Sequence, residues 1–247
     1  ISKMKKRVKT GIIGLDQLLK GGLLEGRSIL LSGPCGSGKS ILSMQYIYNG
    51  ITKFNEPGLY VSFEEHKDRI IENMLTLGFN LKKLEKAKKF ILLGGATGML
   101  SGFMEKIGAE THHIIEEIEE VIKENNIKRV VIDSINLFLM LAKDNKSRRK
   151  ALTKLSHMLS SLGCTSLLIS ETKEGTLDIS RYNLEEFIVD GVIALYQIRQ
   201  ADRFIPGIAI RKMRGTDHDK NIRLFKITNN GILVYPKKTM FTKIKPL

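Results

Sequence analysis

Short apolar runs alternate with longer amphipathic stretches from the beginning of the chain to residue 171. The apolar runs are continuous, which is typical of parallel strands buried on both faces. The stretch 111–125 places Ile114, Ile118 and Ile122 on one face of a helix. This alternation predicts a parallel sheet covered by helices on both faces. The predicted strands are 28–32, 58–63, 90–93, 128–133 and 165–170, and the predicted helices are 40–52, 69–77, 111–125 and 148–162.

After residue 171 the apolar runs follow one another without helical patterns between them. They predict strands at 191–199, 204–213, 223–228 and 231–235, and Asn230-Gly231 is a hairpin-turn signal. The expected fold class is α/β, with a mostly parallel central sheet and an antiparallel β extension at its C-terminal edge. We expect one domain over residues 1–236 and a basic tail over 237–247.

Composition narrows the classes of function. The 40 lysines and arginines exceed the 26 acidic residues, for a net charge of +14, so nucleic acid is a possible partner. The lysines are scattered, however, which favours an ordinary solvated surface. No apolar run approaches the length of about 18 residues that a membrane helix needs. The two cysteines, Cys35 and Cys164, suit a reducing cytoplasm, which is where we expect the protein.

Residues 33–40 match the phosphate-loop pattern G-x-x-x-x-G-K-[ST] in full, between a predicted strand and a predicted helix. In such a loop, backbone N–H groups and the helix N-terminus bind phosphates. We expect ATP there, with Lys39 on the β- and γ-phosphates and Ser40 on Mg²⁺. The expected nucleotide-binding residues are Gly33, Pro34, Cys35, Gly36, Ser37, Gly38, Lys39, Ser40 and Ile41.

Acidic residues follow two further predicted strands. Asp133 ends the strand 128–133 and is the second expected ligand of Mg²⁺ or of its water. Glu64 and Glu65 follow the strand 58–63, where one carboxylate could orient a water against the γ-phosphate. Alternatively, the pair is only the acidic start of the next helix, and the spacing leaves these two readings open. Glu171, after a third strand, could sense the γ-phosphate or merely end the strand.

Several segments resemble KaiC-like proteins of the RecA superfamily of P-loop NTPases, over about residues 10–236. The matching segments are Thr10-Gly11-Ile12-Ile13-Gly14-Leu15-Asp16, Gly21-Gly22-Leu23, Phe63-Glu64-Glu65, Ile132-Asp133-Ser134, Ser180-Arg181-Tyr182, Glu185-Glu186-Phe187, Asp190-Gly191-Val192 and Lys212-Met213-Arg214-Gly215-Thr216-Asp217-His218. The resemblance implies a RecA-like core, Mg²⁺-dependent ATP hydrolysis and a homo-oligomeric ring, expected to be a hexamer with ATP between subunits.

The resemblance also implies roles for individual residues. Glu64 is the expected catalytic carboxylate, Glu65 assists it, and Lys39 completes the catalytic set. The neighbouring subunit's nucleotide would be contacted by Lys212, Arg214, Thr216, His218 and Lys220. The loop 173–182 contains Thr176 and Ser180 but lacks the adjacent hydroxyl pair that is phosphorylated in clock members of the family. We therefore expect no autokinase activity.

The leading hypothesis is an oligomeric regulatory or signalling ATPase with an unidentified protein partner. The alternative is a DNA-binding recombinase paralogue of the RecA/RadA type, using the loops 139–149 and 173–182. Both loops are basic, but Tyr182 is their only aromatic residue for base stacking. A non-hydrolysing ATP-binding scaffold is disfavoured by the intact Glu64-Glu65 pair. His112 and His113 are interpreted as surface histidines.

Overall fold

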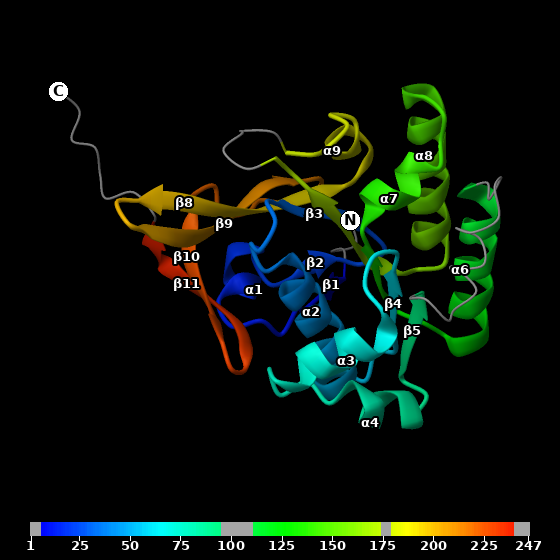
Figure 1. Cartoon of the computed structure of the whole chain (residues 1–247), viewed down its shortest axis with the longest axis horizontal. Helices are drawn as coiled ribbons and strands as arrows, with labels where there is room; N and C mark the ends of the chain where they lie inside the picture. Colours follow the sequence, from blue (N-terminus) through cyan, green and yellow to red (C-terminus); the bar gives the residue numbers. More distant parts are fainter. Residues whose placement is uncertain (1–5, 95–110, 174–178, 240–247) are drawn as a thin grey trace, which may run out of the picture.

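The structure, a computed structural model, describes residues 6–94, 111–173 and 179–239. A nine-stranded sheet runs through its centre. The strands are β3 (Ser28–Gly33), β4 (Gly58–Ser62), β5 (Phe90–Gly94), β6 (Arg129–Asp133), β7 (Thr165–Glu171), β8 (Gly191–Gln200), β9 (Arg203–Met213), β10 (Arg223–Thr228) and β11 (Gly231–Thr239). Their order across the sheet is β11-β10-β9-β8-β3-β7-β6-β4-β5 (Figure 1).

The six strands from β8 to β5 are mutually parallel, and β9, β10 and β11 continue the sheet in antiparallel pairs. The predicted fold class is thus confirmed. The sequence grouped 191–199 with the antiparallel extension, but β8 pairs in parallel with β3 and only its other edge is antiparallel. The long β8–β9 hairpin projects to the left in Figure 1, away from the helices.

Helices cover both faces of the sheet. They are α1 (Leu15–Leu18), α2 (Lys39–Phe54), α3 (Lys67–Leu75), α4 (Leu81–Lys86), α6 (Thr111–Asn125), α7 (Ile135–Met140), α8 (Asn145–Ser161) and α9 (Glu185–Ile188). A small separate sheet pairs β1 (Arg7–Val8) with β2 (Leu23–Leu24). The shortest elements, α1, α4, α7, α9, β1 and β2, were not predicted, because two to six residues carry too little periodicity.

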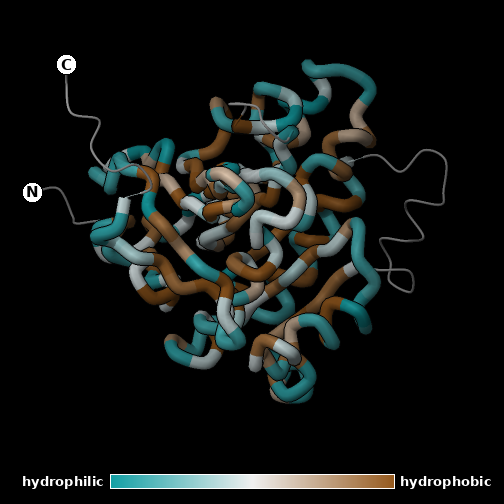
Figure 2. The backbone as a smooth tube through the Cα atoms, turned by 60° about the vertical axis from the view of Figure 1, so that its left-hand side comes forward, coloured by the Kyte–Doolittle hydropathy of each residue, from teal (hydrophilic) through white to brown (hydrophobic). Residues whose placement is uncertain are grey.

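Alternation along β3 divides the core into two clusters. Ile29 and Leu31 pack in one cluster with residues of α1 to α4, whereas Leu30 packs in the other with residues of α6, α7 and α8. Figure 2 shows apolar segments in the interior of the molecule and polar segments at its outside. Helix α2, which follows the phosphate loop, packs against β3, β4, β6 and β7.

Among the element boundaries that differ from the prediction are the beginning of α8 and the end of β11. Helix α8 begins at Asn145 instead of residue 148, because the Asp144 carboxylate accepts a hydrogen bond of 2.7 Å from the Ser147 amide and caps the helix. Strand β11 continues to Thr239, so 237–239 belong to the sheet and not to the expected tail. Residues 240–247 lie outside the described residues.

Candidate nucleotide-binding site

The phosphate loop connects β3 to α2 at the carboxyl edge of the parallel strands. Gly36 and Gly38 have φ angles of +71° and +92°, in the left-handed region that glycine enters without steric cost. At Gly33 a Cβ would come within 2.8 Å of the Leu195 carbonyl oxygen, so this position also requires glycine. The loop is therefore built where the sequence predicted it, with α2 beginning at Lys39.

The Lys39 ammonium lies inside this loop. Its Nζ donates hydrogen bonds to the carbonyl oxygens of Gly33 (3.0 Å) and Pro34 (2.9 Å), and the side chain is only 7% exposed. Burial lowers the pKa of Lys39, against the opposing negative charges of Glu171 and Asp133. The Glu171 carboxylate lies 3.9 Å from Nζ. A buried ammonium with so little direct charge compensation favours an anion at this position.

Ser40 and Asp133 meet beside the loop. Ser40 Oγ donates a hydrogen bond of 3.0 Å to Asp133 Oδ2, and the Tyr60 hydroxyl donates to the same oxygen. Burial raises the pKa of the Asp133 carboxyl, and the hydrogen bonds from Tyr60 and Ser40 oppose that shift. Burial also raises the pKa of Tyr60, so its hydroxyl remains a donor. Hydroxyl and carboxylate oxygens are the ligands that Mg²⁺ prefers.

The two glutamates after β4 point to different partners. Glu64 Oε1 accepts a hydrogen bond of 2.8 Å from Ser134 Oγ, directly after Asp133. Glu65 Oε1 instead accepts a hydrogen bond of 2.8 Å from the Asn73 amide of α3. The structure therefore brings Glu64 to the phosphate-loop side of the sheet edge, and Glu65 to the neighbouring helix.

Lys212, near the end of β9, and Arg214, directly after it, lie at the opposite edge of the sheet from their own phosphate loop. In the register, Met213 pairs with Gly191 and Gly191 pairs with Ile29, near the beginning of β3, whereas the loop follows the end of β3. Lys212 Nζ donates to the carbonyl oxygens of Glu186 (2.6 Å) and Val189 (2.7 Å).

The remaining residues of this segment are also held within the chain. Arg214 donates to the Phe187 carbonyl oxygen at 2.8 Å, and the Thr216 hydroxyl accepts from Arg7. A ring nitrogen of His218 lies 3.0 Å from the Asp219 carbonyl oxygen, and Lys220 is exposed. None of the residues 212, 214, 216, 218 and 220 is brought to the phosphate loop of its own chain.

Sequence reasoning missed several polar residues around the loop. Tyr60 and Ser134 contact the two expected carboxylates, Asn136 Oδ1 accepts a 2.7 Å hydrogen bond from the Glu171 amide, and Gln197 Nε2 donates to the Gly36 carbonyl oxygen at 2.8 Å. A polar residue inside an apolar strand was the available signal for Tyr60. No local signal marks Gln197, because the β8–β9 hairpin brings it to the loop from far along the chain.

The loops expected to bind DNA have internal contacts. The Arg148 guanidinium stacks 4.5 Å from the centroid of the Tyr182 ring, so the one aromatic residue considered for base stacking already has a cationic partner. Ser180 is buried and donates its hydroxyl to Glu186, whereas Thr176 lies outside the described residues.

Within the residues that the structure describes, no helix is long and apolar enough to cross a membrane.

A large open cavity of about 830 Å³ lies at the other edge of the sheet, where the parallel strands begin. Arg27, Lys128 and Glu56 are among its lining residues, and none of the lining residues belongs to the phosphate loop. Size alone would favour this cavity as a ligand site. The side chains with chemistry suited to a nucleotide gather instead at the phosphate loop.

Comparison with known proteins agrees with this geometry. Residues 8–239 match the family described as ATPase: KaiC. A UPF0273 protein of Thermotoga maritima is 38% identical over 95% of this chain and 98% of its own length. The circadian clock oscillator protein KaiC of Thermostichus vulcanus is 36% identical over 95% of this chain, which spans 45% of that longer protein.

A solved structure, that of a KaiC-like protein from Pyrococcus horikoshii, superposes with a TM-score of 0.82 at 35% identity. The match covers 94% of this chain and 100% of the other. The resemblance found in the sequence is thus confirmed over nearly its whole length. The chain belongs to the KaiC family of ATPases and has its RecA-like α/β fold.

Proposed function

We propose that this protein binds ATP with Mg²⁺ and hydrolyses it at the interfaces of a homo-oligomeric ring, of which six subunits is the expected number. One observation carries the proposal. Lys39, Ser40, Asp133 and Glu64 gather at one edge of the sheet, whereas Lys212 and Arg214 lie at the opposite edge of the same chain. A site that uses both groups needs two subunits.

The phosphate loop suits a nucleoside triphosphate. Its glycines allow backbone N–H groups to converge on phosphate oxygens, and the beginning of α2 adds the positive end of the helix dipole. Lys39 is held by two loop carbonyls and can exchange them for phosphate oxygens by rotating its flexible stem. Glu171, within 3.9 Å of Nζ, would then lie near the terminal phosphate.

Ser40 and Asp133 fit Mg²⁺, because both present hard oxygen atoms at the carboxyl edge of the sheet. Bound there, Mg²⁺ would neutralise negative charge on the phosphate oxygens. Tyr60 holds one oxygen of the Asp133 carboxylate in place from inside β4. The carboxylate is thus oriented before any ligand arrives, which reduces the cost of ordering it during binding.

Glu64 is the residue we propose to orient the attacking water. Its carboxylate accepts a hydrogen bond from Ser134, the residue after Asp133. Its negative charge also makes a small contribution that raises the pKa of Lys39, against the larger lowering by burial. A carboxylate in this position can accept a proton from water as the water attacks. Glu65, bonded to Asn73, is proposed only as an assisting residue.

Lys212 and Arg214 are proposed to contact the nucleotide of the neighbouring subunit, together with Thr216, His218 and Lys220. Cations supplied across an interface stabilise the charge of phosphoryl transfer, as arginine fingers do. ATP bound between two subunits would also bias how the ring closes, which supports a regulatory role.

We place the activity in the cytoplasm, since an exposed free thiol, Cys35, lies within the loop.

Mixing two inactive variants tests the shared site. Glu64→Gln removes the proposed base and Arg214→Ala removes the proposed trans cation, so each alone should hydrolyse ATP at least about a hundredfold more slowly. In an equimolar mixture, about a quarter of the interfaces combine an intact Glu64 with an intact Arg214. The mixture should therefore recover about a quarter of wild-type turnover, measured as phosphate release above the assembly concentration.

Controls separate this result from its alternatives. Lys128→Ala, at an exposed position that the proposed site does not use, should leave turnover unchanged. If the mixture remained inactive while both variants still assembled, the shared site would be wrong. Strong stimulation of the wild type by single-stranded DNA would favour the recombinase alternative instead.

A further inference from the structure

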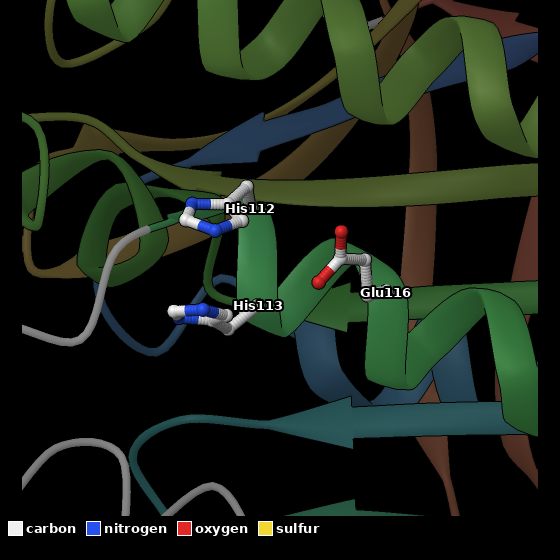
Figure 3. A group of neighbouring side chains, drawn as sticks. All are labelled: His112, His113 and Glu116. Atoms are coloured by element: carbon white, nitrogen blue, oxygen red, sulfur yellow. The ribbon is translucent and has the colours of Figure 1, made fainter.

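The beginning of α6 carries a group of side chains that the nucleotide site does not use. His112, His113 and Glu116 each offer a ligand atom, and these atoms all lie within 4.8 Å of one another. Figure 3 shows the two imidazoles beside each other at the first turn of the helix and the Glu116 carboxylate one turn further along. The sequence pattern alone predicts surface histidines, but in the structure Glu116, four residues after His112, supplies a carboxylate beside them.

The geometry points to a binding site for a divalent transition-metal ion of the zinc class, formed by His112, His113 and Glu116. Two imidazoles and one carboxylate are a common ligand set for zinc in proteins, with water in the fourth position. This set differs from the all-oxygen pair Ser40 and Asp133, which suits Mg²⁺. The two sites would therefore select different metals.

The separations require only a small closure. Ligand atoms about 2.1 Å from a tetrahedral ion lie roughly 3.4 Å apart. His113 and Glu116 are exposed and His112 is half-exposed, so rotation about their side-chain bonds can bring the atoms together without moving the core. The imidazole rings already lie in contact, with centroids 3.9 Å apart.

The charge around the site is suited to a cation. Helix α6 carries five glutamates and a single lysine, although the whole chain has a net charge of +14. Lys123, the lysine, is paired with Glu119 at 2.6 Å. Glu117, four residues after His113, is buried, and within the described residues neither of its carboxylate oxygens has a hydrogen-bond partner. A metal ion on the first turn would offset this local excess of negative charge.

The site also has a place in the fold. Because α6 leads into the beginning of β6, its own first turn lies toward the edge where β4 and β6 end, the edge that carries Glu64 and Asp133. A metal ion at this turn would hold the beginning of α6 in one arrangement at the nucleotide edge of the sheet.

Titration of the whole protein with zinc tests the site directly. We expect saturable binding of one Zn²⁺ per chain by calorimetry in excess Mg²⁺, and visible absorption bands of tetrahedral intensity when Co²⁺ is used instead. His113→Ala or Glu116→Gln should each weaken zinc binding about tenfold or more, because loss of even an outer partner of a metal ligand typically costs that much affinity. His157→Ala, which removes an exposed histidine on α8, is the matched control and should leave the affinity unchanged.

Two outcomes would overturn the proposal. One is the absence of saturable binding by the wild type, or equal affinity in the wild type and both site variants. The other is loss of binding in Cys35→Ser with retention in the site variants, which would place the ion at the phosphate loop. Circular dichroism of each variant checks that the exposed substitutions leave the fold intact.

Discussion

At the scale of single residues, Tyr60 connects the core to the edge of the sheet that we propose binds Mg²⁺. It is 2% exposed, lies on β4 and donates its hydroxyl to the Asp133 oxygen that also accepts from Ser40. An outer partner of this kind orients a metal ligand and affects metal affinity without touching the metal. Asp133 is a buried carboxylate, so each of its hydrogen bonds also offsets the cost of desolvation.

Tyr60→Phe removes that hydroxyl and keeps the ring. We expect the Mg²⁺ concentration for half-maximal ATP hydrolysis to rise about tenfold, because outer-partner mutations typically cost 10- to 100-fold in metal affinity. The matched control is Tyr46→Phe, which removes another buried hydroxyl, one that donates to the Thr165 carbonyl oxygen away from the site. Equal Mg²⁺ dependence in the two variants would show that Tyr60 acts on stability alone.

At the scale of elements, the beginning of α8 depends on a single cap. The Asp144 carboxylate accepts a hydrogen bond of 2.7 Å from the Ser147 amide. Hydrogen bonding to Ser147 lowers the pKa of the Asp144 carboxyl. Because the pKa is lower in the folded state, the capping stabilisation is fully present above the ordinary pKa of Asp. It is lost as the pH falls through the lowered value. Helix α8 packs against α6 and α7, so its first turn supports that whole layer.

Asp144→Ala removes the cap and should lower the melting temperature by about 2–4 °C at neutral pH. The effect should shrink in acid, where the wild-type carboxyl is protonated. Asp144→Asn keeps an acceptor and is the control, with an expected change smaller than that of alanine. Thermal unfolding followed by circular dichroism at two pH values measures both. An alanine effect that stayed constant into acid would contradict the charged cap.

At the scale of the whole molecule, Arg129 ties distant parts of the chain together. Its side chain is fully buried and forms a salt bridge of 2.6 Å with Glu56, while also donating to the carbonyl oxygens of Tyr46 and Lys9. Its guanidinium carbon lies 4.5 Å from the centroid of the Tyr46 ring. One side chain thus joins the N-terminal segment, α2, the segment that precedes β4, and β6.

Arg129→Ala should lower the free energy of unfolding by about 3–5 kcal/mol, because it leaves Glu56 and two carbonyl groups without their partner. Chemical denaturation measures the change, and Lys128→Ala, at the exposed neighbouring position, should have little effect. A loss for Arg129→Ala no larger than that for Lys128→Ala would mean that the network contributes little to stability.

The sequence by itself determined the parts that depend on local pattern. Continuous apolar runs predicted the parallel strands, and the complete pattern of residues 33–40 predicted the phosphate loop, because tight backbone geometry requires glycines at fixed spacing. The acidic residues that follow β4 and end β6 could also be identified, since parallel strands end at the same edge of a sheet. The short helices and the cap at Asp144 were missed.

Only the tertiary structure decided which polar groups meet. Spacing left Glu64 and Glu65 equivalent, and packing separated them by giving one to Ser134 and the other to Asn73. The register of β9 against β8 placed Arg214 at the edge opposite its own phosphate loop, which no local pattern could reveal. The physical reason is that side-chain partners far apart in sequence are selected by strand register and packing, and these depend on the whole fold.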